Sequence, residues 1–276
     1  MGKMGEKGMM QDLQHPRTLG ELFADAGLTL TADTDADLPL SGFTDDSRAV
    51  QPGWVFMAVT GETVDGHRFI GTALEKGAVC VLAEHIPAGI DTTKVIIVAD
   101  ARGALPLLAH AWWGNPSRDM KVIGITGTNG KTTTAYLVEA LLRAAGRRPA
   151  LFSTVEYRFE DYHEEAANTT PGAVALARLM AEFKARGADS IAMEVSSHSL
   201  VQRRVDGIKF EVGLISNVTQ DHLDYHHTME EYALAKRLLF TRHCPVCSVF
   251  NADDATAKDF GARHEGQRLT YSLDAA

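Results

Sequence analysis

The 276-residue sequence predicts an α/β fold, with a small N-terminal α/β domain followed by a central domain built on a mainly parallel sheet. Two observations support this fold class. Short apolar, β-branched runs alternate with helical patterns along the chain, and a glycine-rich turn joins one such run to a helix. A polar, turn-rich stretch at residues 115–119 separates the two parts. We therefore expect a disordered leader over residues 1–14, an N-terminal domain over 15–114 and a central domain over 115–276.

The N-terminal domain is predicted to contain three short strands and three helices. Thr18 can cap a helix over residues 18–27, which Gly27 can end. The strands are apolar runs at residues 55–59, 79–83 and 95–98. The other two helices are predicted at residues 69–76, before Gly77, and at residues 102–113.

The central domain repeats the alternation with longer elements. Its predicted strands cover residues 122–125, 150–154, 190–195, 212–217 and 246–250. Its predicted helices cover residues 131–145, 172–186 and about 230–240, the second with Thr170 as its N-cap. Ligands of such sheets bind at the carboxyl ends of the strands, where polar clusters of this sequence fall.

The glycine-rich turn reads Gly-Ile-Thr-Gly-Thr-Asn-Gly-Lys-Thr-Thr-Thr at residues 124–134. A strand that turns through glycines into a helix presents backbone N–H groups at the positive end of the helix dipole, a site suited to phosphate. Lys131 can neutralise the terminal phosphates and the Thr132 hydroxyl can bind the accompanying Mg²⁺. The usual phosphate loop has a glycine where this chain has Ile125. An ordinary glycine-rich connection would leave the lysine and threonines unexplained, so we predict binding of a nucleoside triphosphate.

Polar side chains follow two further strands. Glu194, Ser196 and His198 follow one strand, and the next is followed by a group of four: Asn217, Asp221, His222 and Asp224. A carboxylate and an imidazole at neighbouring strand ends can hold Mg²⁺ between nucleotide and substrate. The alternative is that His222 and Asp224 only cap the following turn.

Lys236 lies among small and apolar residues of a predicted helix. Burial would lower the pKa of its ammonium. From spacing alone the alternative is favoured, with the stem on apolar surface and the ammonium in water.

Composition argues against several classes of partner. The formal net charge of −9 at pH 7 makes a nucleic-acid partner unexpected. No apolar stretch approaches the roughly 20 residues that cross a bilayer, and no secretory signal is evident. We expect a cytoplasmic protein with no membrane partner. Cys244 and Cys247 have metal-knuckle or redox spacing beside His243, but a single pair favours a simple turn at a strand edge.

The motifs resemble a known family. Gly-Thr-Asn-Gly-Lys-Thr at 127–132 is similar to the nucleotide loop of the Mur ligases and folylpolyglutamate synthetases. Four further motifs resemble Mur ligases that extend the peptide of a peptidoglycan precursor, and the similarity runs from about Thr18 to the end of the chain. These motifs are Asn-Thr-Thr-Pro at 168–171, Glu-Val-Ser-Ser-His at 194–198, Asn-Val-Thr-Gln-Asp-His-Leu-Asp-Tyr-His at 217–226 and Tyr-Ala-Leu-Ala-Lys at 232–236.

The resemblance implies a role for each matching position. Lys131, His222 and Lys236 match catalytic positions, and Lys236 would carry a carbamate. The positions implied to hold ATP are Gly127, Thr128, Asn129, Gly130, Lys131, Thr132 and Thr133. Those implied to hold two Mg²⁺ ions are Thr132, Glu194, His222 and Lys236. Those implied to hold the UDP-muramoyl dipeptide are Ser47, Glu62, Thr63, Val64, Asn168, Thr169, Thr170, Ser196, Gln202 and Arg204.

The implied reaction is ATP-dependent amide ligation through an acyl phosphate, with UDP-N-acetylmuramoyl-L-alanyl-D-glutamate as acceptor. The added group is a diamino acid, and meso-2,6-diaminopimelate is favoured over lysine as the commoner of the two. The resemblance places a UDP-binding domain before the central ATPase domain and a Rossmann-like domain after it. We expect the chain to stop before that third domain and to be inactive alone. The alternatives are another P-loop phosphotransferase, a protein that binds both ligands without turnover, and a folylpolyglutamate synthetase, which would have no use for a uridine unit.

Overall fold

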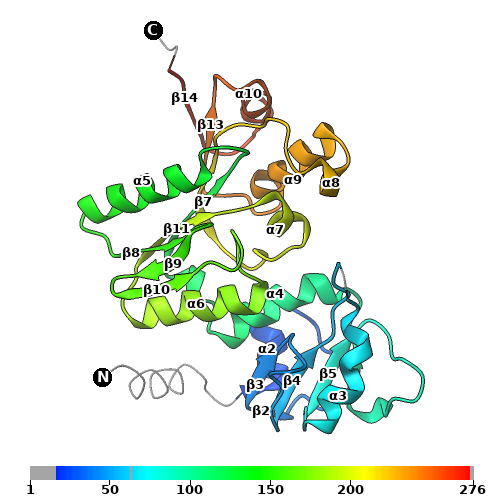
Figure 1. The fold of residues 1–276 in the computed structure, drawn as a ribbon. Helices are drawn as coiled ribbons and strands as arrows, with labels where there is room; N and C mark the ends of the chain where they lie inside the picture. Colours follow the sequence, from blue (N-terminus) through cyan, green and yellow to red (C-terminus); the bar gives the residue numbers. More distant parts are fainter. Residues whose placement is uncertain (1–16, 63, 274–276) are drawn as a thin grey trace. The chain divides into compact units, whose positions relative to one another are not determined.

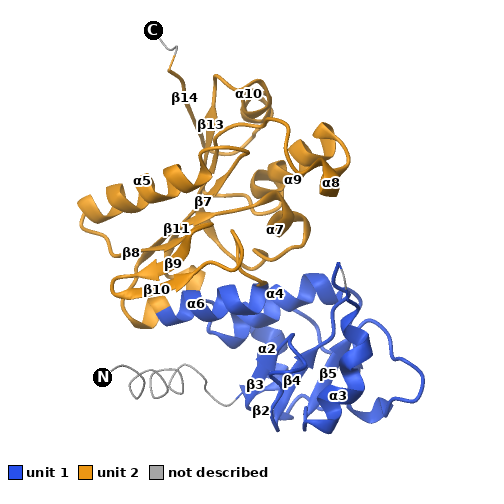
Figure 2. Cartoon of the chain, in the orientation of Figure 1, with its two compact units in different colours: residues 1–115, 173–182 blue, residues 116–172, 183–276 orange. Residues whose placement is uncertain are grey.

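The computed structural model describes residues 17–62 and 64–273. These residues form two compact units, coloured separately in Figure 2. The first contains the described residues up to Asn115 together with Ala173–Glu182, and the second contains Pro116–Gly172 and the described residues from Phe183 onward. The predicted leader over residues 1–14 lies outside the described residues.

The first unit is built on a parallel four-stranded sheet in the order β3-β4-β5-β6 (Figure 1). Its strands are β3 (Gly42–Thr44), β4 (Trp54–Met57), β5 (Cys80–Ala83) and β6 (Val95–Ile97). A small antiparallel pair joins β1 (Arg17–Thr18) to β2 (Pro39–Leu40). The helices are α2 (Leu19–Asp25), η1 (Gly66–Phe69), α3 (Ile70–Glu75), η2 (Thr92–Lys94) and α4 (Ala101–Trp112).

Alternation along the strands explains why both faces of this sheet are covered. Val55 and Met57 of β4 belong to a buried cluster with residues of α2 and α4, whereas Phe56 belongs to a second cluster that includes residues of α3. Successive side chains of a strand point to opposite faces, so each face acquires its own apolar layer. The predicted capping role of Thr18 is confirmed, because its hydroxyl and the Glu21 carboxylate form a capping box at the start of α2.

The second unit holds an eight-stranded sheet in the order β10-β9-β8-β11-β7-β12-β13-β14. The six strands from β8 to β14 in that order pair in parallel. They are β7 (Lys121–Thr126), β8 (Pro149–Phe152), β11 (Ser190–Glu194), β12 (Phe210–Ile215), β13 (Cys247–Asn251) and β14 (Arg268–Tyr271). The prediction of a mainly parallel α/β sheet is therefore confirmed.

Helices lie on both faces of this sheet (Figure 1). Ala135 of α5 packs with Ile123 and Ile125 of β7, so α5 covers one face. None of the described helices is both long and apolar enough to cross a bilayer. The helical segments from residue 116 onward are η3 (Pro116–Arg118), α5 (Lys131–Ala144), α6 (Ala173–Ala185), α7 (Ser197–Val201), α8 (Leu223–His226), α9 (Met229–Thr241) and α10 (Ala255–Ala262).

Two features of the second unit differ from the sequence prediction. An antiparallel hairpin, β9 (Glu156–Phe159) and β10 (Tyr162–Glu165), extends the sheet where no strand was predicted. Charged residues interrupt the apolar pattern of these two strands, so the sequence did not indicate them. Only Tyr157 and Phe159 of the hairpin strands are buried. Thr170 is not the cap of α6, which begins at Ala173; the Thr170 hydroxyl instead donates to the Glu194 carbonyl of β11 over 2.9 Å.

Candidate nucleotide and metal site

The turn between β7 and α5 has the backbone geometry that its glycines allow. Gly127 has φ of 140° and Gly130 has φ of 82°, both in the region that favours glycine. A Cβ on Gly127 would lie 2.0 Å from the Ser216 Oγ, so no larger residue fits there. At Gly130 no atom lies within 4 Å of such a Cβ, and the requirement is conformational alone.

The end of β12 holds this loop from the side. The Thr128 N–H donates to the Asn217 carbonyl over 2.8 Å, and the Asn129 N–H donates to the Asn217 Oδ1 over 3.0 Å. Ser216 Oγ donates to the Asn129 carbonyl over 2.7 Å. The N–H groups of Thr128 and Asn129 are therefore engaged within the protein. The first-turn amides of α5, which lack intrahelical acceptors, are the remaining phosphate donors of the cradle.

Lys131 lies across the loop. Its Nζ donates to the carbonyls of Gly127 and Thr128 over 3.1 and 2.9 Å. Burial lowers the pKa of Lys131, opposed by the negative charges of Glu194 and Asp221. The ammonium thus lies at the loop with two carboxylates near enough to influence it. Beside it, Thr132 is partly exposed and Thr133 is exposed at the start of the helix.

Lys236 of α9 also donates to the Gly127 carbonyl. Its Nζ donates to the Gly127 carbonyl over 2.8 Å and lies 4.2 Å from the centroid of the Tyr232 ring. The side chain is 1% exposed, so the interpretation that its ammonium lies in water is wrong. Burial, reinforced by the positive charge of Lys131, lowers the pKa of Lys236 to about 7. Both effects favour the neutral form of this amine.

Glu194 ends β11 and is fully buried. Its two carboxylate oxygens accept hydrogen bonds from the Thr154 N–H (2.9 Å) and the Thr154 hydroxyl (3.1 Å). Its negative charge opposes the lowering of the Lys131 pKa at the phosphate loop. A buried carboxylate beside this loop fits a site for a cation.

His222 opens the second polar cluster. It has φ of 52°, and its half-exposed ring lies 3.5 Å from the Asp221 carboxylate. The ring meets His198 edge-on, with centroids 4.8 Å apart. Buried beneath this cluster, His226 shares a hydrogen bond of 2.9 Å with the Ser197 hydroxyl. Burial lowers the pKa of His226 to about 4, with nearby positive charges adding to the effect.

The residues predicted to hold the dipeptide are joined in the second unit by hydrogen bonds. Arg204 donates through Nη1 to the Thr170 carbonyl over 3.1 Å and through Nε to the Gln202 Oε1 over 2.7 Å. Ser196 N–H donates to the Thr170 hydroxyl over 3.2 Å. Asn168 bonds to the Tyr157 hydroxyl through its N–H and its carbonyl. The Thr169 hydroxyl accepts from Thr154 over 3.2 Å.

The other residues implied to hold the UDP-muramoyl dipeptide, those whose loops resemble the uridine-binding loops of the family, belong to the first unit. The Ser47 carbonyl accepts from Lys76 Nζ over 3.1 Å. Glu62 and Val64 are exposed in the loop that leads to Asp65, and Thr63 lies outside the described residues.

One group of possible metal ligands lies elsewhere in the first unit. Among the described residues, Asp65, His67 and His85 have ligand atoms within 4.8 Å of one another. The Nε2 of His67 accepts from the Glu84 N–H (3.1 Å), so its Nδ1 carries the proton that is donated to Asp65 (2.6 Å). Both nitrogens of His67 are thus engaged, which is typical of a structural pair. Cys244 and Cys247 belong to no such group in the described part of the chain.

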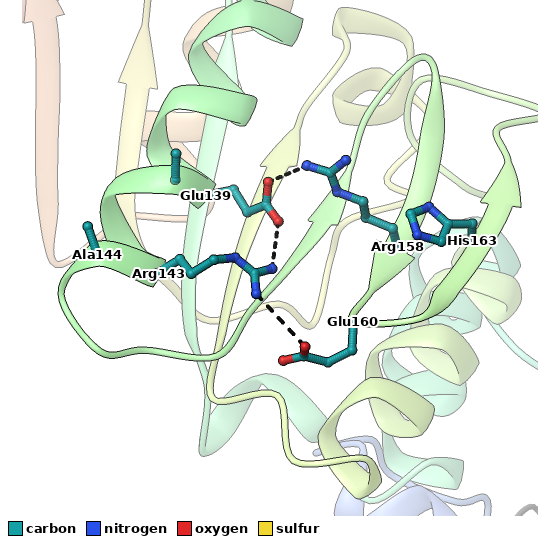
Figure 3. Close-up of a pocket in the computed structure, with 7 residues that line it drawn as sticks. Glu139, Arg143, Ala144, Arg158, Glu160 and His163 are labelled. Carbon is teal, nitrogen blue, oxygen red and sulfur yellow. Dashed lines mark hydrogen bonds and ion pairs between the residues drawn. The ribbon is translucent and has the colours of Figure 1, made fainter.

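A hollow of about 500 Å³ lies between α5 and the β9–β10 hairpin. Figure 3 shows the residues that line it. The buried Glu139 carboxylate binds Arg143 and Arg158, and Arg143 also approaches Glu160 at 3.9 Å. These charges neutralise one another, so the hollow offers no excess charge to a ligand. Its ion pairs instead connect the hairpin to the helix that follows the phosphate loop.

Sequence reasoning assigned no role to Tyr232. Its hydroxyl lies 3.2 Å from the Thr128 hydroxyl, which also donates to the Thr219 carbonyl over 3.1 Å. Tyr232 stands four residues before Lys236 and so shares its helix face, which was the available signal. It connects the loop to α9.

Comparison with known proteins identifies this arrangement. Residues 125–276 match the model of the Mur ligase middle domain, and residues 40–111 match that of the Mur ligase family catalytic domain. The first match alone covers more than half of the chain. The chain belongs to the Mur ligase family. The predicted fold class is likewise that of Mur ligase structures.

Several Mur ligases are similar over most of this chain. The UDP-N-acetylmuramoyl-L-alanyl-D-glutamate–2,6-diaminopimelate ligase of Listeria monocytogenes is 43% identical over 251 residues, which are 88% of this chain and 50% of that protein. The ligase of the same name from Chlorobaculum tepidum is 45% identical over 232 residues, 83% of this chain and 46% of that protein. The chain therefore spans about half the length of the curated relatives it matches.

Solved structures give the same result. A UDP-N-acetylmuramoyl-L-alanyl-D-glutamate–2,6-diaminopimelate ligase has a TM-score of 0.80 and 29% identity, covering 95% of this chain and 53% of that one. The MurF ligase of Thermotoga maritima, solved in complex with ADP, has a TM-score of 0.60 and 24% identity, covering 84% of this chain and 50% of that one. The latter likeness shows the fold alone.

Proposed function

We propose that this chain supplies the ATP site and the UDP-muramoyl dipeptide site of an ADP-forming amide ligase. The ligase would add meso-2,6-diaminopimelate to UDP-N-acetylmuramoyl-L-alanyl-D-glutamate in the cytoplasmic synthesis of peptidoglycan precursor. The observation that carries the proposal is the convergence of Lys131 and Lys236 on the Gly127 carbonyl, with Glu194 near Lys131. Similarity to ligases named for diaminopimelate supports that amino acid over lysine.

The chain's own groups would bind and orient the triphosphate. First-turn amides of α5 would donate to phosphate oxygens, and Lys131 would leave the loop carbonyls to neutralise the γ-phosphoryl group. Because Lys131 is partly buried, its charge would act with little screening by water.

The donor set fits Mg²⁺. Thr132 hydroxyl, Glu194 carboxylate and His222 imidazole would hold two ions together with Lys236, which would serve as a carbamate. An ammonium cannot bind a cation, whereas the carbamate of a neutral amine is anionic, and the lowered pKa of Lys236 favours that neutral amine. Bound Mg²⁺ would neutralise charge on the transferring phosphoryl group.

Residues at the ends of β11 and α7 would orient the acceptor. Thr170, Ser196, Gln202 and Arg204, with Asn168 and Thr169, would hold the dipeptide so that its terminal carboxylate faces the γ-phosphoryl group. In the first unit, Ser47, Glu62, Thr63 and Val64 would hold the uridine nucleotide. Phosphorylation makes the carboxylate an acyl phosphate, which the amine of the diamino acid then attacks with loss of phosphate.

The binding of Mg·ATP to Lys131→Ala tests the nucleotide site. We expect its dissociation constant to rise at least 10-fold, because about 1.5–3 kcal/mol of charge-assisted hydrogen bonding is lost. Isothermal titration calorimetry measures it. Lys121→Ala is a matched control, since Lys121 is exposed at the start of β7 and pairs with Glu211. Equal affinity of Lys131→Ala and the unchanged chain would contradict the proposal.

A second measurement separates a ligase from a phosphotransferase. In the protein that contains this chain, ADP release by a ligase requires both the UDP-muramoyl dipeptide and the diamino acid. ADP release that needs the dipeptide alone would favour the phosphotransferase. Binding of Mg·ATP and of the UDP-muramoyl dipeptide by the 276-residue chain is expected in either case.

A further inference from the structure

Tyr225 of α8 lies between two groups of residues to which the proposed function gives different tasks. One group, Gln202 and Arg204, is proposed to hold the dipeptide; the other contains His222, proposed to hold a metal ion. Tyr225 is half-buried and belongs to neither group. Its contacts with both are specific.

The hydroxyl of Tyr225 faces the dipeptide side. Gln202 Nε2 donates to it over 3.4 Å. The orientation of that amide is fixed, because the Gln202 Oε1 accepts from Arg204 Nε over 2.7 Å, leaving the NH₂ group for the tyrosine. Arg204 in turn donates to the Thr170 carbonyl, and the Thr170 hydroxyl donates to the Glu194 carbonyl. A continuous set of hydrogen bonds thus runs from Tyr225 to the end of β11.

The ring of Tyr225 faces the metal side. It packs on the His198 ring, with centroids 4.2 Å apart and planes inclined by 38°. His198 then meets the His222 ring edge-on at 4.8 Å. The side chain of His222 is half-exposed, and its ring also meets the Tyr232 ring edge-on at 6.1 Å. Of these two ring contacts the one with His198 is the closer, so packing by His198 restrains the His222 ring.

We propose that Tyr225 is a positioning residue that couples the dipeptide-binding side chains to the metal ligand His222. The coupling rests on the proposed function, because it needs both ligands to bind this unit. The hydroxyl would restrain Gln202, and the ring would restrain His222 through His198. Dipeptide bound at Gln202 would then strengthen the binding of Mg·ATP. Bound Mg·ATP would strengthen the binding of the dipeptide by the same factor, since coupling between two binding sites is reciprocal.

Two variants separate the two contacts. Tyr225→Phe keeps the ring and removes the hydrogen bond with Gln202, so we expect the dissociation constant of the UDP-muramoyl dipeptide to rise about 5-fold while that of Mg·ATP is unchanged. Tyr225→Leu removes the ring as well, and loss of support for a metal-binding histidine should weaken Mg·ATP binding about 10-fold or more. Calorimetry of the 276-residue chain measures both constants.

The coupling itself is measured by titrating Mg·ATP with and without saturating dipeptide. The unchanged chain should bind Mg·ATP more tightly when dipeptide is present, and Tyr225→Leu should lose this difference. Tyr271→Leu, at a half-exposed tyrosine of β14, is the matched control. If the unchanged chain binds both ligands and Tyr225→Leu behaves like the control, the positioning role is wrong. If the unchanged chain binds neither ligand, the proposed function fails instead.

Discussion

Two lysines donate to a single backbone carbonyl at Gly127, and this contact is the central residue-scale feature of the site. Placing like charges together is unfavourable, and the positive charge of Lys131 lowers the pKa of Lys236. For Lys236 the effect adds to full burial, which brings its pKa to about 7. Groups with shifted pKa values cluster at functional sites, as these two do at the phosphate loop.

A residue-scale prediction concerns His110 of α4. Its ring is fully buried, neither ring nitrogen has a hydrogen-bond partner among the described residues, and burial lowers its pKa to about 4. The folded-state pKa lies below the unfolded value, so the unfolded chain binds the proton more readily. Stability is therefore lost as the pH falls from about 6.5 towards 4, by on the order of 2–3 kcal/mol for this group.

His110→Leu removes that proton-binding group and keeps an apolar side chain in the core. We expect the free energy of unfolding, measured by urea titration at pH 7 and pH 4.5, to fall less in this variant than in the unchanged chain. His227→Asn serves as the control, because it removes a histidine that is exposed. If the free energy of unfolding falls equally between pH 7 and pH 4.5 in His110→Leu and in the unchanged chain, His110 is not a source of acid sensitivity.

At the scale of elements, the β9–β10 hairpin is held to α5 by buried ion pairs rather than by an apolar layer alone. Glu139 of α5 is 5% exposed and binds Arg158 of β9, whose guanidinium also lies 4.7 Å from the centroid of the Tyr136 ring. Tyr136 donates to Glu156 over 2.9 Å. Because α5 begins at the phosphate loop, these contacts also restrain the helix whose first turn faces the proposed nucleotide.

Glu139→Gln tests this connection between hairpin and helix. Loss of the charge leaves Arg158 with a weaker buried partner, so we expect the free energy of unfolding to fall by about 1–3 kcal/mol. Glu160→Gln changes an exposed carboxylate whose arginine contacts are 3.7 and 3.9 Å, and it should cost less than about 1 kcal/mol. Urea unfolding of both variants measures the decrease in the free energy of unfolding. An equal decrease in the two variants would show that burial of Glu139 does not strengthen its ion pairs.

At the scale of the whole molecule, the chain divides its expected tasks between two units. Each has its own sheet, parallel in the first unit and mainly parallel in the second, and its own buried apolar residues. The proposed nucleotide ligands all belong to the second unit, whereas the proposed uridine contacts belong to the first. Each unit can therefore respond to its own ligand.

Hydrogen exchange read by mass spectrometry tests this division. Saturating Mg·ATP should slow exchange in β7, the first turn of α5 and the end of β12, and leave β4 and β5 of the first unit unchanged. A ligand present at 100 times its dissociation constant stabilises the folded state that binds it by about 2.7 kcal/mol, which is enough to detect as slower exchange. At the same ATP concentration, Lys131→Ala, whose dissociation constant is expected to be at least 10-fold higher, should reduce the protection to about 1.4 kcal/mol or less. Equal slowing in both units would contradict independent responses.

The sequence by itself determined the alternating strands and helices, the phosphate loop and the family, because these depend on local periodicity and on residues close together in the chain. Tertiary structure alone decided the environment of side chains. Lys236 is buried because α9 packs on the loop, the Asn129 amide is occupied because β12 ends beside it, and Thr170 bonds to β11 instead of capping α6. Burial and hydrogen bonding of this kind depend on residues far apart in sequence, which no local pattern records.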